Sequence, residues 1–240
     1  MARRIETVAA GHVQAGAERL PLAVRMDPRA RRLTLRLVGD TVRVTCPSRR
    51  HVRDAVRLAE ARGGWLAERR AAQPAPVPFE VGRTLPVLGA PRLIEAAARP
   101  GAAARLTPDA IITGGADQPA VARRVEALLR REAHAFLTAC ANAHARTLGL
   151  PPCPVTVRNT RSRWGSCSAA PALSFSWRLA LAPLPVADYV AAHEVAHRRH
   201  MDHSAAFWGV VAQLMPDYRT HADWLRENGA SLHAYGRAPG

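Results

Sequence analysis

The pentad His193-Glu194-Val195-Ala196-His197 restricts the fold of this chain more than any other feature of its sequence. Two imidazoles four residues apart lie about 40° apart around an α-helix, with side chains about 5 to 6 Å from each other. They can share one metal ion, and Glu194 can reach a water on that metal without being a ligand. The pattern therefore predicts a metal-carrying helix from residue 188 to about 201.

A catalytic zinc usually has three protein ligands and one open position, so a third ligand must come from outside the pentad. His203 lies just beyond the predicted helix, where a chain reversal would return it to the ion. His200 competes with it but sits a full turn beyond His197, too far along a straight helix. A downstream carboxylate is the other alternative: Asp217, Asp223 or Glu227. We expect His203 to complete the site, with one Zn²⁺ per chain.

Plainer interpretations of these residues are less convincing. A surface helix can read HExxH by chance, but here four histidines fall within eleven residues, followed by a capped helix. Cys167 could in principle be a nucleophile, yet nothing nearby in the sequence orients a histidine toward it. The aromatic residues around the pentad have the spacing of core positions on strands and helices.

The first half of the chain has the pattern of a small β-rich domain with a helix. Residues 32–37 and 41–45 alternate between apolar and polar side chains on either side of Gly39-Asp40, which predicts a hairpin. Helical spacing follows over residues 49–70, and then a proline-rich connector over 71–78. Weak strand signals around 79–88 and 109–113 complete an expected domain at residues 1–115.

The second half has the pattern of a helix-rich domain with a small antiparallel sheet. Helical spacing runs over residues 119–148, and a turn at 161–168 precedes a strand at 172–177. After the pentad helix, Ser204 can cap a helix to about 215, and a last helix should span about 216–229. We expect an α+β fold whose second domain covers residues 116–240.

Charge and composition restrict the surroundings of the protein. The net charge of +15 comes entirely from arginine, because the sequence has no lysine. Such a charge is compatible with a nucleic-acid partner, but a genome biased toward arginine codons would produce it too. Four cysteines without CxxC spacing, no apolar run of about 20 residues, and no apolar leader predict a cytoplasmic protein without a membrane partner.

The chain resembles the YgjP-like family of zinc metallopeptidases, which are related to the SprT-like proteases. The resemblance rests mainly on residues 155–228, and the Arg31-Arg-Leu-Thr-Leu-Arg hairpin and the Trp65 helix resemble the family's N-terminal part. The motifs that carry it are Ser162-Arg-Trp-Gly-Ser-Cys-Ser, Trp177-Arg-Leu, Asp188-Tyr-Val, His193-Glu-Val-Ala-His, His203-Ser and Phe207-Trp208.

This resemblance implies a peptide or unfolded-protein substrate, zinc on His193, His197 and His203, and Glu194 as the catalytic base. It also implies that the strand from Leu173 to Trp177 borders the cleft, where a sheet edge can hold an extended peptide. Three residues are candidates for steadying the oxyanion: Arg161, Arg163 and Tyr218.

Two other functions remain compatible with the sequence. A metal-activated water attacks phosphate as readily as amide, so a metal-dependent nucleotide phosphohydrolase is the main rival. A DNA-associated protease or binding protein is the second, because of the basic charge. Nothing in the sequence predicts an oligomeric state.

Overall fold

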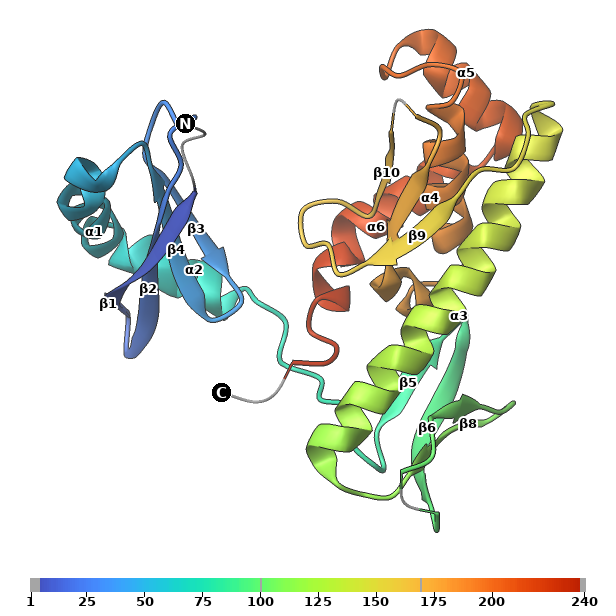
Figure 1. Ribbon diagram of the computed structural model, residues 1–240, viewed down its shortest axis with the longest axis horizontal. Helices are drawn as coiled ribbons and strands as arrows, with labels where there is room; N and C mark the ends of the chain where they lie inside the picture. Colours follow the sequence, from blue (N-terminus) through green and yellow to red (C-terminus); the bar gives the residue numbers. More distant parts are fainter. Residues whose placement is uncertain (1–4, 100, 169, 238–240) are drawn as a thin grey trace. The chain divides into compact units, whose positions relative to one another are not determined.

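The computed structural model describes residues 5–99, 101–168 and 170–237, and it confirms the expected α+β class (Figure 1). The chain divides into two compact units, the first ending at Gln73 and the second beginning at Pro74. Each unit has an apolar core of its own. None of the helices in the described residues is long and apolar enough to cross a membrane.

The first unit is a four-stranded sheet with two helices packed on one face (Figure 1). Its strands, in the spatial order β1-β2-β4-β3, are β1 (Glu6–Ala15), β2 (Glu18–Met26), β3 (Thr34–Val38) and β4 (Thr41–Cys46). The pair β3–β4 is the hairpin that the sequence predicts, and β2 and β4 pair in parallel. The hairpin β1–β2 was not predicted, because a bulge between Ala9 and His12 interrupts its alternation.

The single helix expected over residues 49–70 is divided. A short 3₁₀ turn, η1 (Arg49–His51), leads into α1 (Val52–Ala61), and α2 (Gly63–Ala71) follows after a break at Arg62. Gly63 lies where α2 meets β1, and a Cβ at this position would come within 2.7 Å of the Gln14 carbonyl oxygen. The close approach therefore requires glycine there.

The second unit begins with another four-stranded sheet. Its strands, in the order β5-β6-β8-β7, are β5 (Thr84–Val87), β6 (Ala90–Ala97), β7 (Arg105–Leu106) and β8 (Ala110–Gly114). Two antiparallel hairpins again join through a parallel central pair, β6 and β8, so the two four-stranded sheets share one topology.

This second sheet shares its core with the long helix α3 (Gln118–Thr147), which begins at the Asp117 cap and ends before Gly149. The boundary between the two compact units therefore falls in the sequence between Gln73 and Pro74. That is earlier than the boundary at 115/116 that the sequence indicates. The physical reason is that the buried side chains of β5, β6 and β8 pack with α3 rather than with the first sheet.

A three-stranded sheet follows α3. Its strands, in the order β10-β11-β9, are β9 (Val155–Arg158), β10 (Gly165–Cys167) and β11 (Leu173–Ser176). The pair β10–β11 is antiparallel, and β9 adds to β11 in parallel. Because β11 is the central strand, it has no free edge, and the expectation that this strand offers an edge to a peptide is corrected. The edge strands are β10 and β9, and β10 is the one that contacts α4.

The remaining elements follow this sheet in the chain. They are the 3₁₀ segment η2 (Trp177–Leu181) and the helices α4 (Leu184–Ala196), α5 (Ala205–Leu214) and α6 (Tyr218–Leu232). The helix α4 packs against α3, α5, α6 and β10, and most of its residues are buried. It starts four residues earlier and ends five residues earlier than the sequence predicts, with Pro185 in its first turn.

Candidate metal centre

The last turn of α4 carries the first two histidines of the site. His193 and Glu194 are helical, and His197 is the residue that ends the helix. Because the helix stops there, the chain turns back within six residues, and His203 returns to the face of α4 that carries His193. A histidine ten residues after His193 thus reaches the pentad.

The three imidazole rings lie close together. The Nε2 atoms of His193 and His203 are 3.2 Å apart, and one nitrogen from each of His193, His197 and His203 lies within 4.8 Å of the others. Two nitrogens bound to one tetrahedral zinc at about 2.0 to 2.1 Å are roughly 3.3 Å apart. The separation of His193 and His203 agrees with this value, and the three nitrogens lie close enough together to share one metal ion.

The supporting contacts fix the orientation and the protonation of these rings. The Nδ1 of His197 lies 3.1 Å from the His200 carbonyl oxygen, so Nδ1–H donates there and Nε2 keeps its lone pair. Burial, and then the neighbouring His197 and His203, lower the pKa of His193 to about 4. Burial also lowers the pKa of His197. Both rings are therefore neutral near pH 7, as metal ligands must be.

Aromatic side chains hold the histidine rings in place. The His193 ring centroid lies 4.9 Å from that of Phe207, 5.7 Å from that of Trp208 and 6.0 Å from that of Tyr189. Phe207 also packs against the other two imidazoles. The Ser204 side chain caps α5 by accepting a hydrogen bond from the Phe207 N–H. This bond fixes the start of α5, and with it Phe207, next to His203.

Glu194 is a buried carboxylate, with only 6% of its surface exposed. Burial raises its pKa to about 7, against the opposing effects of the Arg163 charge and a hydrogen bond from the Cys167 backbone. Gly165 on β10 lies directly against it, since a Cβ there would come within 2.5 Å of the carboxylate Oε1. The edge strand β10 therefore fixes the position of the Glu194 side chain.

A cavity of about 300 Å³ unites these groups. Its walls are formed by one stretch of β10, the end of α4 and the turn that follows: Gly165, Ser166, Cys167, His193, Glu194, His197, Met201 and His203. Met201 is 60% exposed and gives the cavity an apolar part at its mouth.

The three candidate oxyanion residues lie in different places. Arg163 is close enough to Glu194 to lower its pKa. Arg161 acts instead on Arg178 and His233, whose pKa values it lowers together with their burial. Tyr218 stacks on Trp208, with ring centroids 5.4 Å apart, and is not among the residues that line the cavity.

The alternative third ligands are engaged elsewhere. His200 contributes its carbonyl oxygen, not its ring, to the contact with His197. The Asp217 carboxylate contacts His221 at 3.1 Å, and Asp223 contacts Arg226 at 2.8 Å. Glu227 lies 3.7 Å from the same arginine. Among the residues that the structure describes, the cluster with metal-ligand spacing is the one of three histidines.

Sequence reasoning missed the residues that shape the site without being ligands. Gly165 and Met201 line the cavity, as does Cys167, which the sequence offered only as a nucleophile, and Tyr189 packs on His193. Tyr189 is one helical turn before His193, and this i, i+4 relation is a signal that could have identified it. Gly165 appears in the sequence only as a glycine that follows a tryptophan in a predicted turn, and this pattern does not indicate its contact with Glu194.

Comparison with known proteins finds a metallopeptidase family. The family model described as YgjP-like, metallopeptidase domain, matches residues 31–228. No curated protein sequence matches the chain. Among solved structures, the crystal structure of the metallopeptidase zymogen of Pyrococcus abyssi abylysin matches 38% of this chain and 93% of that chain, at 18% identity and a TM-score of 0.36. A similarity that low adds nothing to the assignment.

Proposed function

Because the chain belongs to the YgjP-like metallopeptidase family, we propose that it is a zinc-dependent peptidase with His193, His197 and His203 as zinc ligands. The observation that carries the proposal is the meeting of three imidazole nitrogens within 4.8 Å beside a buried carboxylate. When bound, zinc supplies a Lewis acid that polarises the scissile carbonyl and makes water a better nucleophile.

Glu194 is the proposed general base. Its carboxylate lines the same cavity as the three imidazoles, and its pKa of about 7 suits a group that must both accept and release a proton near neutral pH. It takes a proton from the attacking water as the new carbon–oxygen bond forms. It then passes that proton to the leaving amine as the carbon–nitrogen bond breaks.

The edge of β10 supports an extended peptide as the substrate. The main-chain groups of Trp164 and Ser168 hydrogen-bond to Ser176 and Ala172 at the two ends of β11. In an antiparallel ladder such residues alternate with residues whose main-chain N–H and C=O groups point away from the partner strand, and here these are Gly165 and Cys167. The Cys167 N–H is taken by Glu194. The remaining outward main-chain groups of Gly165 and Cys167 can pair with a peptide strand next to Glu194.

Arg163 is the proposed oxyanion residue among the three candidates, because its charge already acts on the Glu194 carboxylate. Arg161 and Tyr218 lack such a relation to the cavity. The guanidinium of Arg163 would stabilise negative charge that develops on the carbonyl oxygen during attack.

The test is hydrolysis of a fluorescein-labelled unfolded protein by wild type and by Glu194→Gln. We expect the substitution to lower the rate by about 10² to 10⁴-fold, the usual contribution of a general base, while zinc content stays unchanged. Release of phosphate from nucleoside triphosphates is measured in parallel. Phosphate release by wild type without proteolysis would favour the phosphohydrolase and contradict the peptidase.

A further inference from the structure

The uncovered face of the first unit's sheet carries a concentration of arginine. The helices α1 and α2 pack on the opposite face, where the buried side chains of the first core lie. Strand alternation and the strand registers put four arginines on the uncovered face: Arg19, Arg25, Arg36 and Arg43. We call these four residues the arginine face.

Three of the arginines on this face lie next to one another. Arg36 on β3 and Arg43 on β4 are direct cross-strand partners, and Arg25 on β2 lies diagonally from Arg43. Like charges placed opposite each other in a sheet are destabilising. The pairing therefore costs folding free energy, which indicates that the charge serves a partner rather than the fold.

Carboxylates are nearly absent from this face. By the same registers, Glu6 and Glu18 belong to the opposite, helix-covered side. Among the described residues, the arginine face has one ion pair, which joins Arg25 to Asp27, just beyond β2, at 3.5 Å. The Nε atoms of Arg25 and Arg43 are buried without a hydrogen-bond partner. Both guanidinium groups are held against the sheet, and Asp27 offsets the charge of Arg25 only.

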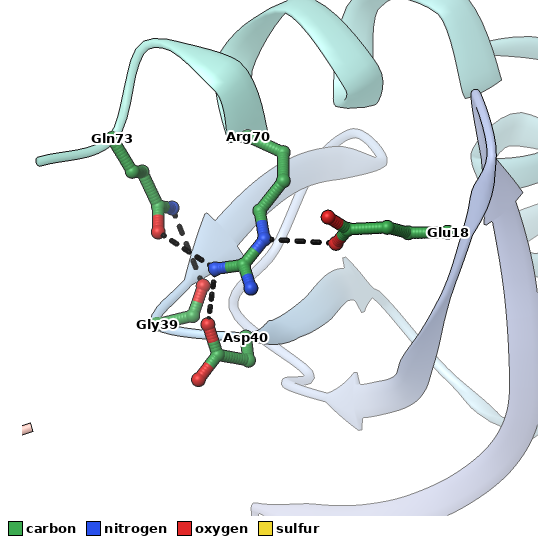
Figure 2. Close-up of polar contacts among 5 residues, drawn as sticks. All are labelled: Glu18, Gly39, Asp40, Arg70 and Gln73. Atoms are coloured by element: carbon green, nitrogen blue, oxygen red, sulfur yellow. Dashed lines mark hydrogen bonds and ion pairs between the residues drawn. The ribbon is translucent and has the colours of Figure 1, made fainter. Parts of the chain in front are cut away.

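The carboxylates at the rim of the sheet are occupied on the helix side, as Figure 2 shows. The Nε of Arg70 donates to Glu18 at 3.0 Å, and its Nη1 contacts Asp40. The hydrogen bond to Glu18 is the main cause of the raised pKa of Arg70. Gln73 completes the cluster by donating to the Gly39 carbonyl oxygen at 3.3 Å. The carboxylates of Glu18 and Asp40 are thus paired with Arg70 of α2 and not with the arginine face.

The chemistry of the face matches a chain of phosphates. Residues 1–73 hold 16 of the 34 arginines and seven of the 19 acidic residues, a net charge of +9 out of +15. Threonines between the arginines add hydroxyl donors: Thr34, Thr41 and Thr45. The strands β1 to β4 contain no Phe, Tyr or Trp, and His12 on β1 is their one side chain with an aromatic ring, so a platform for stacking successive bases is missing from them.

We propose that the arginine face binds the phosphodiester backbone of a nucleic-acid duplex without reading its base sequence. Contacts to phosphates position a protein on a duplex but carry no sequence information directly. The inference is independent of the proposed peptidase activity, since none of its residues belongs to the metal centre.

The test is fluorescence anisotropy of a labelled DNA duplex of about two helical turns, titrated with the full-length protein over a range of salt concentrations. The double variant Arg36→Gln/Arg43→Gln removes two charges from the arginine face. Arg53→Gln/Arg57→Gln removes two exposed charges from α1 and is the matched control. The same titration with an RNA duplex of the same sequence shows whether the face prefers DNA or RNA.

The face variant is expected to raise the Kd about tenfold or more and to reduce the salt slope by about 2, whichever duplex binds more tightly. The control and Glu194→Gln should bind as wild type does. The melting temperature of the face variant should be unchanged or higher, because repulsion between the two cross-strand charges is lost. Three results would overturn the proposal: no duplex binding by wild type, equal losses in variant and control, or binding to anionic phospholipid vesicles alone.

Discussion

Gly165 shows at the scale of one residue how the candidate site depends on the absence of a side chain. Its Cα lies so close to Glu194 that an added Cβ would come within 2.5 Å of both Cγ and Oε1. The carboxylate is itself buried and held by the Cys167 backbone, so it cannot move aside freely. The distance between strand and carboxylate is therefore set by glycine.

Gly165→Ala should retain zinc but lose most peptidase activity, because the Cβ displaces Glu194 from its place in the cavity. A displacement of about 1 Å can cost on the order of 10²-fold in rate. The comparison uses steady-state hydrolysis and elemental analysis of the same preparations. Gly209→Ala is the matched control, since a Cβ on this α5 residue would meet nothing within 4 Å. Equal activity of the two variants would refute the role given to Gly165.

The sequence predicts the three histidines and Glu194 because their chemistry is encoded in short spacing along the chain. The sequence cannot predict toward which neighbouring groups a side chain in a turn is directed. Arg161 and Arg163 are two residues apart, yet one acts on Arg178 and the other on Glu194. The contact of Gly165 with Glu194 joins two elements distant in sequence, and no local pattern signals it.

At the scale of elements, α4 is held by a polar contact with α3. The His144 Nε2 and the Asp188 Oδ1 are 2.7 Å apart, and His144 is almost fully buried. Burial raises the pKa of Asp188, but the hydrogen bond and charge of His144 outweigh it and hold the pKa below its ordinary value. The contact thus ties together the two helices on which the second unit is built.

Asp188→Asn should destabilise the protein by about 1 to 3 kcal/mol near pH 7, the cost of leaving a buried partner poorly paired. Because the folded pKa of Asp188 is depressed, its contribution is present above the ordinary value of 3.8 and is lost as the pH falls below it. Urea unfolding of wild type and variant at several pH values measures this. A stability difference that does not shrink at acid pH would contradict the assigned cause.

Helices were easier to predict than strands for a physical reason. A helix such as α3 repeats its apolar spacing over many turns, and its predicted and observed limits differ by one residue at each end. The strand β1 is bulged where it pairs with β2, and the short strand β9 pairs with β11 rather than with the next strand in the chain. The helix α4 is buried on almost all sides, so its first turn lacked the one-sided pattern that marks a helix start.

The whole molecule consists of two units with separate cores, and the linker between them follows Gln73. The sequence predicted a β-rich first part and a helix-rich second part, and located the proline-rich connector. It could not show that the sheet β5–β8 belongs to the second unit. That depends on which core receives its buried side chains, and both four-stranded sheets have the same topology.

Val44→Ala should destabilise the first unit alone. Val44 is fully buried in the first core, and the loss of its methyl groups should cost about 2 kcal/mol. Zinc content and peptidase activity should stay at the wild-type level in the absence of denaturant. Hydrogen exchange followed by mass spectrometry can measure both units separately. Faster exchange throughout α3 and α4 would show that the two cores unfold together, against this expectation.

The central claim is that three histidines, one of them beyond the helix, hold one zinc ion. Its most direct test is the zinc content of purified wild type, His203→Ala and His200→Ala, determined by elemental analysis. The account predicts about one zinc per chain in wild type and in His200→Ala, whose backbone carbonyl still supports His197, and clear loss in His203→Ala. Zinc retained by His203→Ala, or lost equally from both variants, would contradict it.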